Sequence, residues 1–224
     1  MISYKLHLIR HGITSGNLMG LYQGSGTDLP LCDEGIAQLE NLKSKFTYPA
    51  VEKLYVSPMK RAVETAEIIF PEMDYTFISD LRECNFGEFE GKTFKELMEA
   101  DENFARWMDP TSGYQPAGGE SSSDFVNRVV SALDEIFTDM MKKGIHEAAR
   151  VTHGGVISTL MAAVAFPRKS PGEWSSDNGC GFTLATDPQM WTRDGYAQAV
   201  EILPLGYDFS QSDFNRYIKK NREG

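Results

Sequence analysis

Two side chains capable of phosphate chemistry follow directly after an apolar run near the start of the chain. The stretch LIRHGITSGN, residues 8–17, places Arg10 and His11 where the apolar residues stop and a polar, Gly-containing cluster begins. A neutral imidazole is a nucleophile, and a guanidinium is a permanently charged, planar donor suited to phosphate oxygens. Either residue alone is more often a surface residue or a helix cap than a catalyst. The interpretation therefore depends on what the rest of the chain brings to the same place.

Three further segments place chemically capable side chains where a predicted strand ends. In RVTHGGVISTLM an apolar strand ends at His153, and Gly154 and its neighbour open a helix. In YVSPMKRAVETA the strand ends at a Ser-Pro pair, and Arg61 falls in the first turn of the next helix. In LRECNFGEFEG, Glu83 follows a strand and begins a less regular stretch. Ligands of open parallel sheets bind beyond the carboxyl ends of the strands, so we expect these side chains to meet the first pair there.

The elements that must hold these segments alternate along the chain. Short apolar runs predict six strands, at residues 4–9, 53–57, 75–78, 149–152, 181–185 and 197–203. Apolar residues at helical spacing predict helices over residues 36–46, 62–70 and 125–140. The third helix has a capping box at Ser121 and a stop at Gly144. This order is typical of an α/β fold with a mostly parallel central sheet and helices on both faces.

One stretch interrupts this alternation. Residues 84–125 carry scattered aromatic side chains, one short helical signal at residues 93–100 and a Pro- and Gly-rich segment. The length of 224 residues, with no internal repeat, fits one domain. We therefore expect a single domain over residues 1–224, with 84–125 inserted as a cap over the carboxyl ends of the strands and 206–224 as a polar surface tail.

The four segments together resemble a known family. RHG, SPMKRAVETA, LRECNFGEFEG and THGG, in this order, are similar to the motifs of the histidine phosphatase superfamily, in the branch related to phosphoglycerate mutase. The resemblance extends over residues 6–203, nearly the whole chain. It implies a phosphohistidine on His11, Glu83 as the proton donor, and His153 as a hydrogen-bonding partner of the transferring phosphoryl group.

The charges expected around the phosphoryl group follow from residue type. Arg10 and Arg61 supply positive charge for its oxygens, as phosphoryl transfer requires. Two neighbouring guanidinium groups are also expected to lower the pKa of the His11 imidazole, because they disfavour its cation. His11 would thereby remain neutral and nucleophilic.

Further phosphate contacts are predicted around these residues. Backbone N–H groups at Gly12 and Gly154 are expected to donate hydrogen bonds. The resemblance adds Asn17 and, through YQGSGTDLPLCDEG, the Gln23-Gly24 pair. Together with the two glycines, the predicted phosphate-contacting positions are Gly12, Asn17, Gln23, Gly24 and Gly154. Ile13 stands where the mutase branch has an acidic or amide residue, so the resemblance does not define the substrate contacts at that position.

Composition excludes several classes of partner. The net charge is −10, which argues against a nucleic-acid or anionic-membrane surface because such partners need a broad basic field. The sequence shows neither a secretory pattern nor an apolar run long enough to span a bilayer, so we expect a cytoplasmic protein. Cys32, Cys84 and Cys180 are odd in number and widely spaced, which favours reduced thiols. The histidines and carboxylates lack metal-ligand spacing, so we expect neither a metal nor a cofactor.

The sequence thus predicts a metal-independent phosphomonoesterase that acts on a small-molecule phosphomonoester. One alternative is a phosphoglycerate mutase using the same phosphohistidine, and another is an inactive relative that binds a phosphorylated ligand or a protein partner. A metallohydrolase built from the four histidines is a weaker alternative. The substrate alcohol stays open between a sugar phosphate, phosphoserine, α-ribazole phosphate and others, and so does the oligomeric state.

The charge of the predicted insertion favours a phosphatase over a mutase. A mutase substrate carries a second anionic group, which needs further cations. Residues 84–125 hold only three basic residues against nine acidic ones, so monophosphates of neutral or zwitterionic alcohols are the expected substrates. The aromatic residues there either offer apolar surface to a leaving group or attach the insertion to the sheet: Phe86, Phe89, Phe94, Phe104, Trp107 and Tyr114.

Overall fold

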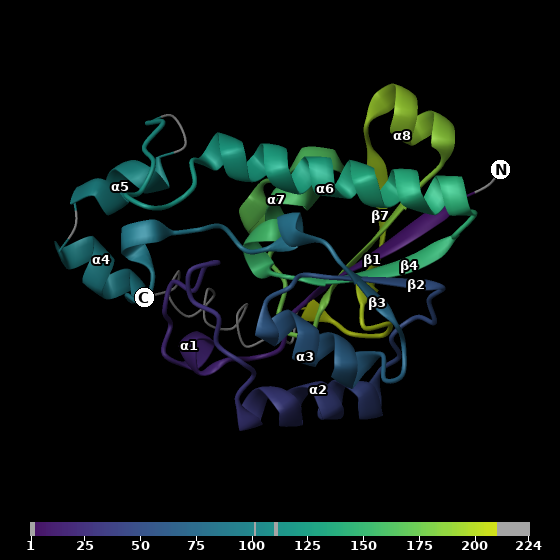
Figure 1. Ribbon diagram of the computed structural model, residues 1–224, viewed down its shortest axis with the longest axis horizontal. Coiled ribbons are helices and arrows are strands. Elements are labelled where there is room, and N and C mark those ends of the chain that lie inside the picture. Colours follow the sequence, from purple (N-terminus) through teal and green to yellow (C-terminus); the bar gives the residue numbers. More distant parts are fainter. Residues whose placement is uncertain (1–2, 101, 110–111, 210–224) are drawn as a thin grey trace.

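A seven-stranded sheet forms the middle of the molecule, in the order β3-β2-β4-β1-β6-β7-β5 (Figure 1). The computed structural model describes residues 3–100, 102–109 and 112–209. The strands are β1 (Tyr4–Arg10), β2 (Lys53–Val56), β3 (Tyr75–Phe77), β4 (Glu147–Thr152), β5 (Ala165–Phe166), β6 (Gly181–Thr186) and β7 (Ala197–Leu203). Only β6 runs against its neighbours within the described chain, so the predicted mostly parallel α/β fold is confirmed.

The register of β1 and β4 brings the two histidine segments together. These strands are parallel neighbours, and Arg10 lies opposite Thr152. The next residues, His11 and His153, therefore leave the sheet side by side at its carboxyl edge. Neighbouring parallel strands thus join two segments that are more than a hundred residues apart in the sequence.

Helices cover both faces of the sheet, as expected. The helices are α1 (Ser15–Leu18), α2 (Asp33–Lys45), α3 (Lys60–Ile69), α4 (Phe94–Ala100), α5 (Glu102–Met108), α6 (Ser122–Lys143), α7 (Gly154–Val164) and α8 (Pro188–Asp194). In Figure 1, α2 and α3 lie on one side of the strands and α6 and α7 on the other. Each pair buries its own core against the sheet, one around Leu39 and Ala62, the other around Leu133 and Ile157. Ile36, counted in the apolar stripe of α2, is instead 43% exposed.

The predicted start and stop of α6 lie where expected. The Ser121 side chain accepts a hydrogen bond from the Asp124 N–H, and Gly144 ends the helix in the left-handed conformation. The cap is not the reciprocal box expected, because the Asp124 carboxylate accepts from the Ser121 hydroxyl and not from its backbone. Helices α1, α5 and α8 and strand β5 were not predicted, because each spans seven residues or fewer and shows little periodicity.

The inserted segment lies beside the carboxyl ends of the strands, with α4 and α5 on it (Figure 1). Its two ends are joined by two hydrogen bonds. The Glu120 N–H donates to the Asn85 carbonyl (2.9 Å), and the Glu120 carboxylate accepts from the Asn85 N–H (2.8 Å). Arg128 of α6 binds this carboxylate and also donates to the carbonyls of Asp80 and Arg82. The chain on either side of Glu83 is thereby fixed to α6.

Several residues outside the predicted site have structural roles. The three cysteines are unpaired, as expected. His7 is buried in the sheet, where it bonds Thr183 and Glu147, and His146 stacks on Tyr4. None of the helices that the structure describes is both long and apolar enough to cross a membrane.

The predicted polar tail is described only in its first residues. Tyr207 donates to Asp177 (2.8 Å), and the ring of Phe209 lies 5.5 Å from that of Phe182. These residues pack against the body of the protein. The rest of the predicted tail, residues 210–224, lies outside the described residues.

Candidate active site

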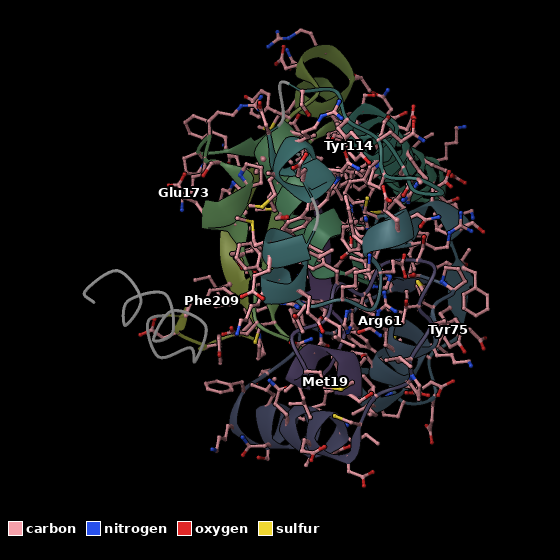
Figure 2. The ribbon with its side chains drawn as sticks, turned by 90° about the vertical axis from the view of Figure 1, so that its left-hand side faces the viewer. Met19, Arg61, Tyr75, Tyr114, Glu173 and Phe209 are labelled. Carbon is pink, nitrogen blue, oxygen red and sulfur yellow. The ribbon has the colours of Figure 1, made fainter. Side chains whose placement is uncertain are left out.

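A cavity of about 820 Å³ opens at the carboxyl ends of β1 and β4. Six of the predicted site residues line it: Arg10, His11, Asn17, Gln23, Glu83 and Gly154. The insertion contributes Phe86, and the segment before β6 contributes Glu173 and Ser176. Figure 2 shows Glu173 at the edge of the molecule and Arg61 among the side chains of its middle. Arg61 and His153 are wholly buried beneath the cavity.

The tautomer of His11 is fixed by one hydrogen bond. Its Nδ1 lies 2.7 Å from the Gly12 carbonyl, which can only accept, so the proton is on Nδ1 and Nε2 carries the lone pair. Burial lowers the pKa of His11 well below its usual value, and the charges of Arg61 and Arg10 lower it further. The prediction named only the arginines, whereas burial is the larger cause. His11 is therefore neutral, and Nε2 is its nucleophilic atom.

Three residues that line this cavity carry buried donors without a partner in the described part of the chain. Arg10 donates through Nη1 to the Ser176 carbonyl (2.6 Å), but its Nε has no acceptor within the described part of the chain. Gln23 Nε2 and Ser176 Oγ are also buried and unpartnered there. Burying donors without acceptors is costly, so an anion with several oxygens would stabilise this arrangement. Ser176 was not predicted, because no motif or periodicity marks it.

Glu83 is held by two backbone N–H groups. Its carboxylate accepts from Cys84 N (3.0 Å) and Gly155 N (2.9 Å). Burial nevertheless raises the pKa of Glu83, outweighing these hydrogen bonds and the charges of Arg61 and Arg10. Position 155 must be glycine for this contact, because a Cβ there would lie 2.5 Å from Glu83 Oε1.

The second carboxylate of the cavity behaves differently. Glu173 is exposed, and hydrogen bonds from the Ser170 hydroxyl and N–H lower its pKa. It therefore stays ionised under conditions in which Glu83 can hold a proton. The two environments favour Glu83 as the acid of the cavity.

His153 makes contacts that differ from those expected. Its Nδ1 accepts from Arg61 Nε (3.2 Å), so Nε2 carries the proton and donates to Ser57 Oγ (2.8 Å). Its ring centroid lies 5.2 Å from that of His11. Both nitrogens thus have protein partners, and a bond to a phosphoryl group requires Ser57 to be displaced. Ser57 follows β2 in a wholly buried position, and no motif or spacing in the sequence predicted this role.

Arg61 is likewise engaged within the protein. It donates through Nη1 to the Thr27 carbonyl (2.9 Å) and through Nη2 to the Gly24 carbonyl (3.1 Å). It therefore orders the loop containing Gln23 and Gly24, and its charge acts on His11 from below the cavity. All three guanidinium nitrogens of Arg61 thus donate to protein groups in this structure, so Arg61 supplies its positive charge without a donor left for the phosphoryl oxygens.

The glycines predicted as phosphate donors have different surroundings. The Gly12 N–H donates to Thr65 Oγ1 (2.9 Å), so it does not point to a ligand as expected. Gly24 does not line the cavity; a side chain there would collide with the Cys84 carbonyl. Gly154 begins α7, where the first N–H groups have no partner inside the helix. Gly154 alone of these three lines the cavity, and its hydrogen bond to a phosphate stays a prediction.

The remaining predicted residues form the wall around α1. Asn17 and Thr14 cap α1 reciprocally, and Thr14 Oγ1 donates to Gln23 Oε1 (2.7 Å), while the Gln23 amide nitrogen has no partner among the described residues. Asn178, missed in the sequence, donates to the His11 carbonyl (2.9 Å). Ile13 does not line the cavity, and its carbonyl accepts from the Cys32 N–H. Within the described chain, no group of three or more His, Cys, Asp or Glu side chains is placed to hold a metal ion.

The chain is similar to one family model, to relatives named as phosphatases and to a solved phosphatase structure. The model of the histidine phosphatase superfamily (branch 1) matches residues 6–198. The adenosylcobalamin/α-ribazole phosphatase of Salmonella typhimurium is 31% identical over 79% of this chain and 87% of its own. Phosphoserine phosphatase 1 of Hydrogenobacter thermophilus is 33% identical over 59% of this chain and 64% of its own. The crystal structure of the α-ribazole phosphatase from Shigella flexneri superimposes with a TM-score of 0.70, at 28% identity over 91% of this chain and 99% of that one.

Proposed function

The chain belongs to branch 1 of the histidine phosphatase superfamily, and on that premise we propose that it hydrolyses small phosphomonoesters through a phosphohistidine on His11. The carrying observation is the Nδ1 hydrogen bond to Gly12, which leaves the Nε2 lone pair for attack. Similar proteins named as phosphatases for α-ribazole phosphate and phosphoserine support a phosphomonoester substrate.

The reaction consists of two balanced transfers. In the first, Nε2 of His11 forms a bond to phosphorus while the bond to the alcohol oxygen breaks, and Glu83 gives its proton to the leaving oxygen. In the second, water attacks phosphorus, Glu83 takes up a proton from it, and His11 leaves with the electron pair. Inorganic phosphate departs and His11 is again neutral.

The phosphoryl oxygens are bound by groups of this chain alone in the proposed mechanism. Arg10, Gln23 and Ser176 line the cavity, each with a buried donor that has no partner among the described residues, and the N–H of Gly154 joins them. His153 joins the reaction by exchanging its bond to Ser57 for one to a phosphoryl oxygen. These donors supply the charge stabilisation that a metal ion supplies in other phosphatases, so no metal is required.

Hydrolysis is favoured over mutase activity by the charges of the cavity. Among the described residues that line it, Arg10 is the sole Lys or Arg, and Glu83 and Glu173 are both acidic. A second anionic group on a bound substrate would therefore find no further cation. This charge pattern favours esters with one phosphate.

Replacing His11 tests the proposal. His11→Ala is expected to abolish phosphate release, because the attacking atom is lost. The wild-type protein, treated with EDTA and quenched during turnover, is expected to stay active and to carry acid-labile, alkali-stable phosphate on His11. His146→Ala, which changes an exposed histidine on Tyr4, is the matched control and is expected to keep full activity. Turnover by the His11→Ala protein would refute the phosphohistidine.

A further inference from the structure

A second cavity borders the proposed proton donor. It has a volume of about 230 Å³ and shares Glu83, Phe86 and Gly155 with the active-site cavity. Glu83 and Gly155 are hydrogen-bonded to each other, so this bonded pair lies at the boundary of both cavities. A molecule whose reacting oxygen contacts the Glu83 carboxyl therefore lies next to the second cavity.

The walls of this second cavity are apolar. They include Phe86 and Trp107 of the insertion, and Phe125 and Val126 of α6. Glu83 is the one charged side chain among the described residues that line it. Apolar cavities of about 150 Å³ accommodate benzene, so this one has room for a phenyl ring or a short alkyl chain. Val126 is 38% exposed, which places this part of the wall at the protein surface.

The aromatic residues of the insertion divide into two groups. Phe89 and Phe104 are wholly buried and hold the insertion together with Leu97. Phe86 and Trp107 pack against that group but also form walls of cavities next to Glu83. Packing thus accounts for Phe89 and Phe104, whereas Phe86 and Trp107 also have the position that contact with a leaving group would require.

We propose that the second cavity binds the apolar part of the leaving alcohol. This inference rests on the proposed function, because only protonation by Glu83 places the leaving oxygen there. The preferred substrates are then monophosphate esters of alcohols that carry an alkyl or aryl group within a few bonds of the ester oxygen. One phosphate fills the active-site cavity, and the apolar group leaves water to pack against Trp107, Phe125 and Val126 in the second cavity.

A series of unbranched alkyl monophosphates, from methyl to pentyl, tests this inference. Their leaving alcohols differ little in acidity, so kcat/KM reports mainly on binding of the chain. Burial of each methylene is expected to raise kcat/KM about fourfold until the cavity is full, which gives a pentyl-to-methyl ratio of at least about tenfold. Val126→Phe, which fills the cavity, is expected to lower this ratio about tenfold. Ser122→Leu, on the exposed first turn of α6 at the same cavity, is a second filling variant.

The control makes the same substitution elsewhere. Val200→Phe changes a valine of β7 that is 44% exposed and lies outside both cavities, and it is expected to keep the wild-type ratio. Equal kcat/KM for methyl and pentyl phosphate, or an unchanged ratio in both filling variants, would overturn this inference and leave the proposed function standing. Failure of the wild type to release phosphate from any ester, with no phosphate on His11, would overturn the proposed function itself.

Discussion

At the scale of single residues, the two carboxylates of the cavity show how environment separates chemical roles. Glu83 is buried and its pKa is raised, whereas Glu173 is exposed, bonded to Ser170, and its pKa is lowered. A proton donor must still be protonated at working pH, and of the two carboxyl groups only Glu83 has a raised pKa. The neutral His11 beside it needs no deprotonation before attack, because its pKa is already well below the usual value.

Glu83 should therefore govern the pH dependence of the first chemical step. We expect kcat/KM for an alkyl phosphate to fall as the pH rises through the raised pKa of Glu83, because the proton for the leaving oxygen is then lost. Glu83→Gln should remove this fall of kcat/KM with rising pH and should lower kcat/KM by about 10² to 10⁴. The loss should be smaller for p-nitrophenyl phosphate, whose leaving group departs without a proton. Glu173→Gln is the control, and an altered pH profile in that variant would contradict the assignment of the acid.

The types of the site residues could be predicted from sequence, but their contacts could not. Arg10, His11 and Glu83 line the cavity because Arg10 ends β1, His11 follows it and Glu83 comes after β3 of the same sheet. The partners of Arg61 and His153 depend on Gly24, Thr27 and Ser57, which lie on other segments. Such hydrogen bonds leave no spacing pattern in the sequence.

At the scale of elements, β4 carries an unusual buried arginine. Arg150 is wholly buried between Leu8 and Tyr55 of the neighbouring strands, and none of its guanidinium nitrogens has a hydrogen-bond partner among the described residues. Burial, assisted by the charge of Arg128, lowers its pKa to about 9. A buried cation without a partner opposes folding.

Arg150→Met is accordingly expected to stabilise the protein. Removing the unpaired charge should raise the free energy of unfolding by about 1 to 4 kcal/mol at neutral pH, measured by urea denaturation. The folded-state pKa lies below the unfolded one, so the wild type binds fewer protons when folded and gains stability as the pH rises beyond about 9. The advantage of the variant should shrink there. Arg168→Met, at an exposed arginine, should have little effect; an Arg150→Met protein no more stable than the wild type would contradict this account.

Long elements could be predicted from sequence more readily than short ones. Helix α6 has twenty-two residues and repeats an apolar stripe from Phe125 to Met140, and β7 was predicted with its correct limits. By contrast, α8 has seven residues, and its signals are local ones: a hydrogen bond from Met190 N to the Asp187 carboxylate and a left-handed Gly195. Such caps become informative only once the neighbouring strands are known.

At the scale of the whole molecule, the chain carries a net charge of −10, while Arg10 lines the active-site cavity and Arg61 is buried near it. The field of the protein repels polyanions, and local attraction comes from Arg10 and the buried Arg61. Substrates with a single phosphate gain this attraction with the least repulsion.

Bisphosphates should therefore be poor substrates. We expect 2,3-bisphosphoglycerate and fructose 2,6-bisphosphate to have lower kcat/KM than alkyl monophosphates, and phosphoglycerate isomers not to be interconverted. A coupled mutase assay beside phosphate release on one preparation measures both. A mutase flux greater than the rate of hydrolysis would show that the charge of this cavity does not predict its substrate preference.

The junction between Asn85 and Glu120 has a consequence for how this fold can be altered. The chain leaves and returns at one point, closed by backbone and carboxylate hydrogen bonds, while Glu83 lies just outside it. We expect that exchange of residues 86–119 reshapes the surroundings of the leaving alcohol without moving the strands that carry Arg10, His11 and His153, provided that the replacement keeps Glu90, whose carboxylate accepts from Gly26 N (2.9 Å) and Thr27 Oγ1 (2.5 Å) of the loop that Arg61 binds. Substrate preference can diverge in such a scaffold by loop replacement alone, with the phosphoryl chemistry inherited intact.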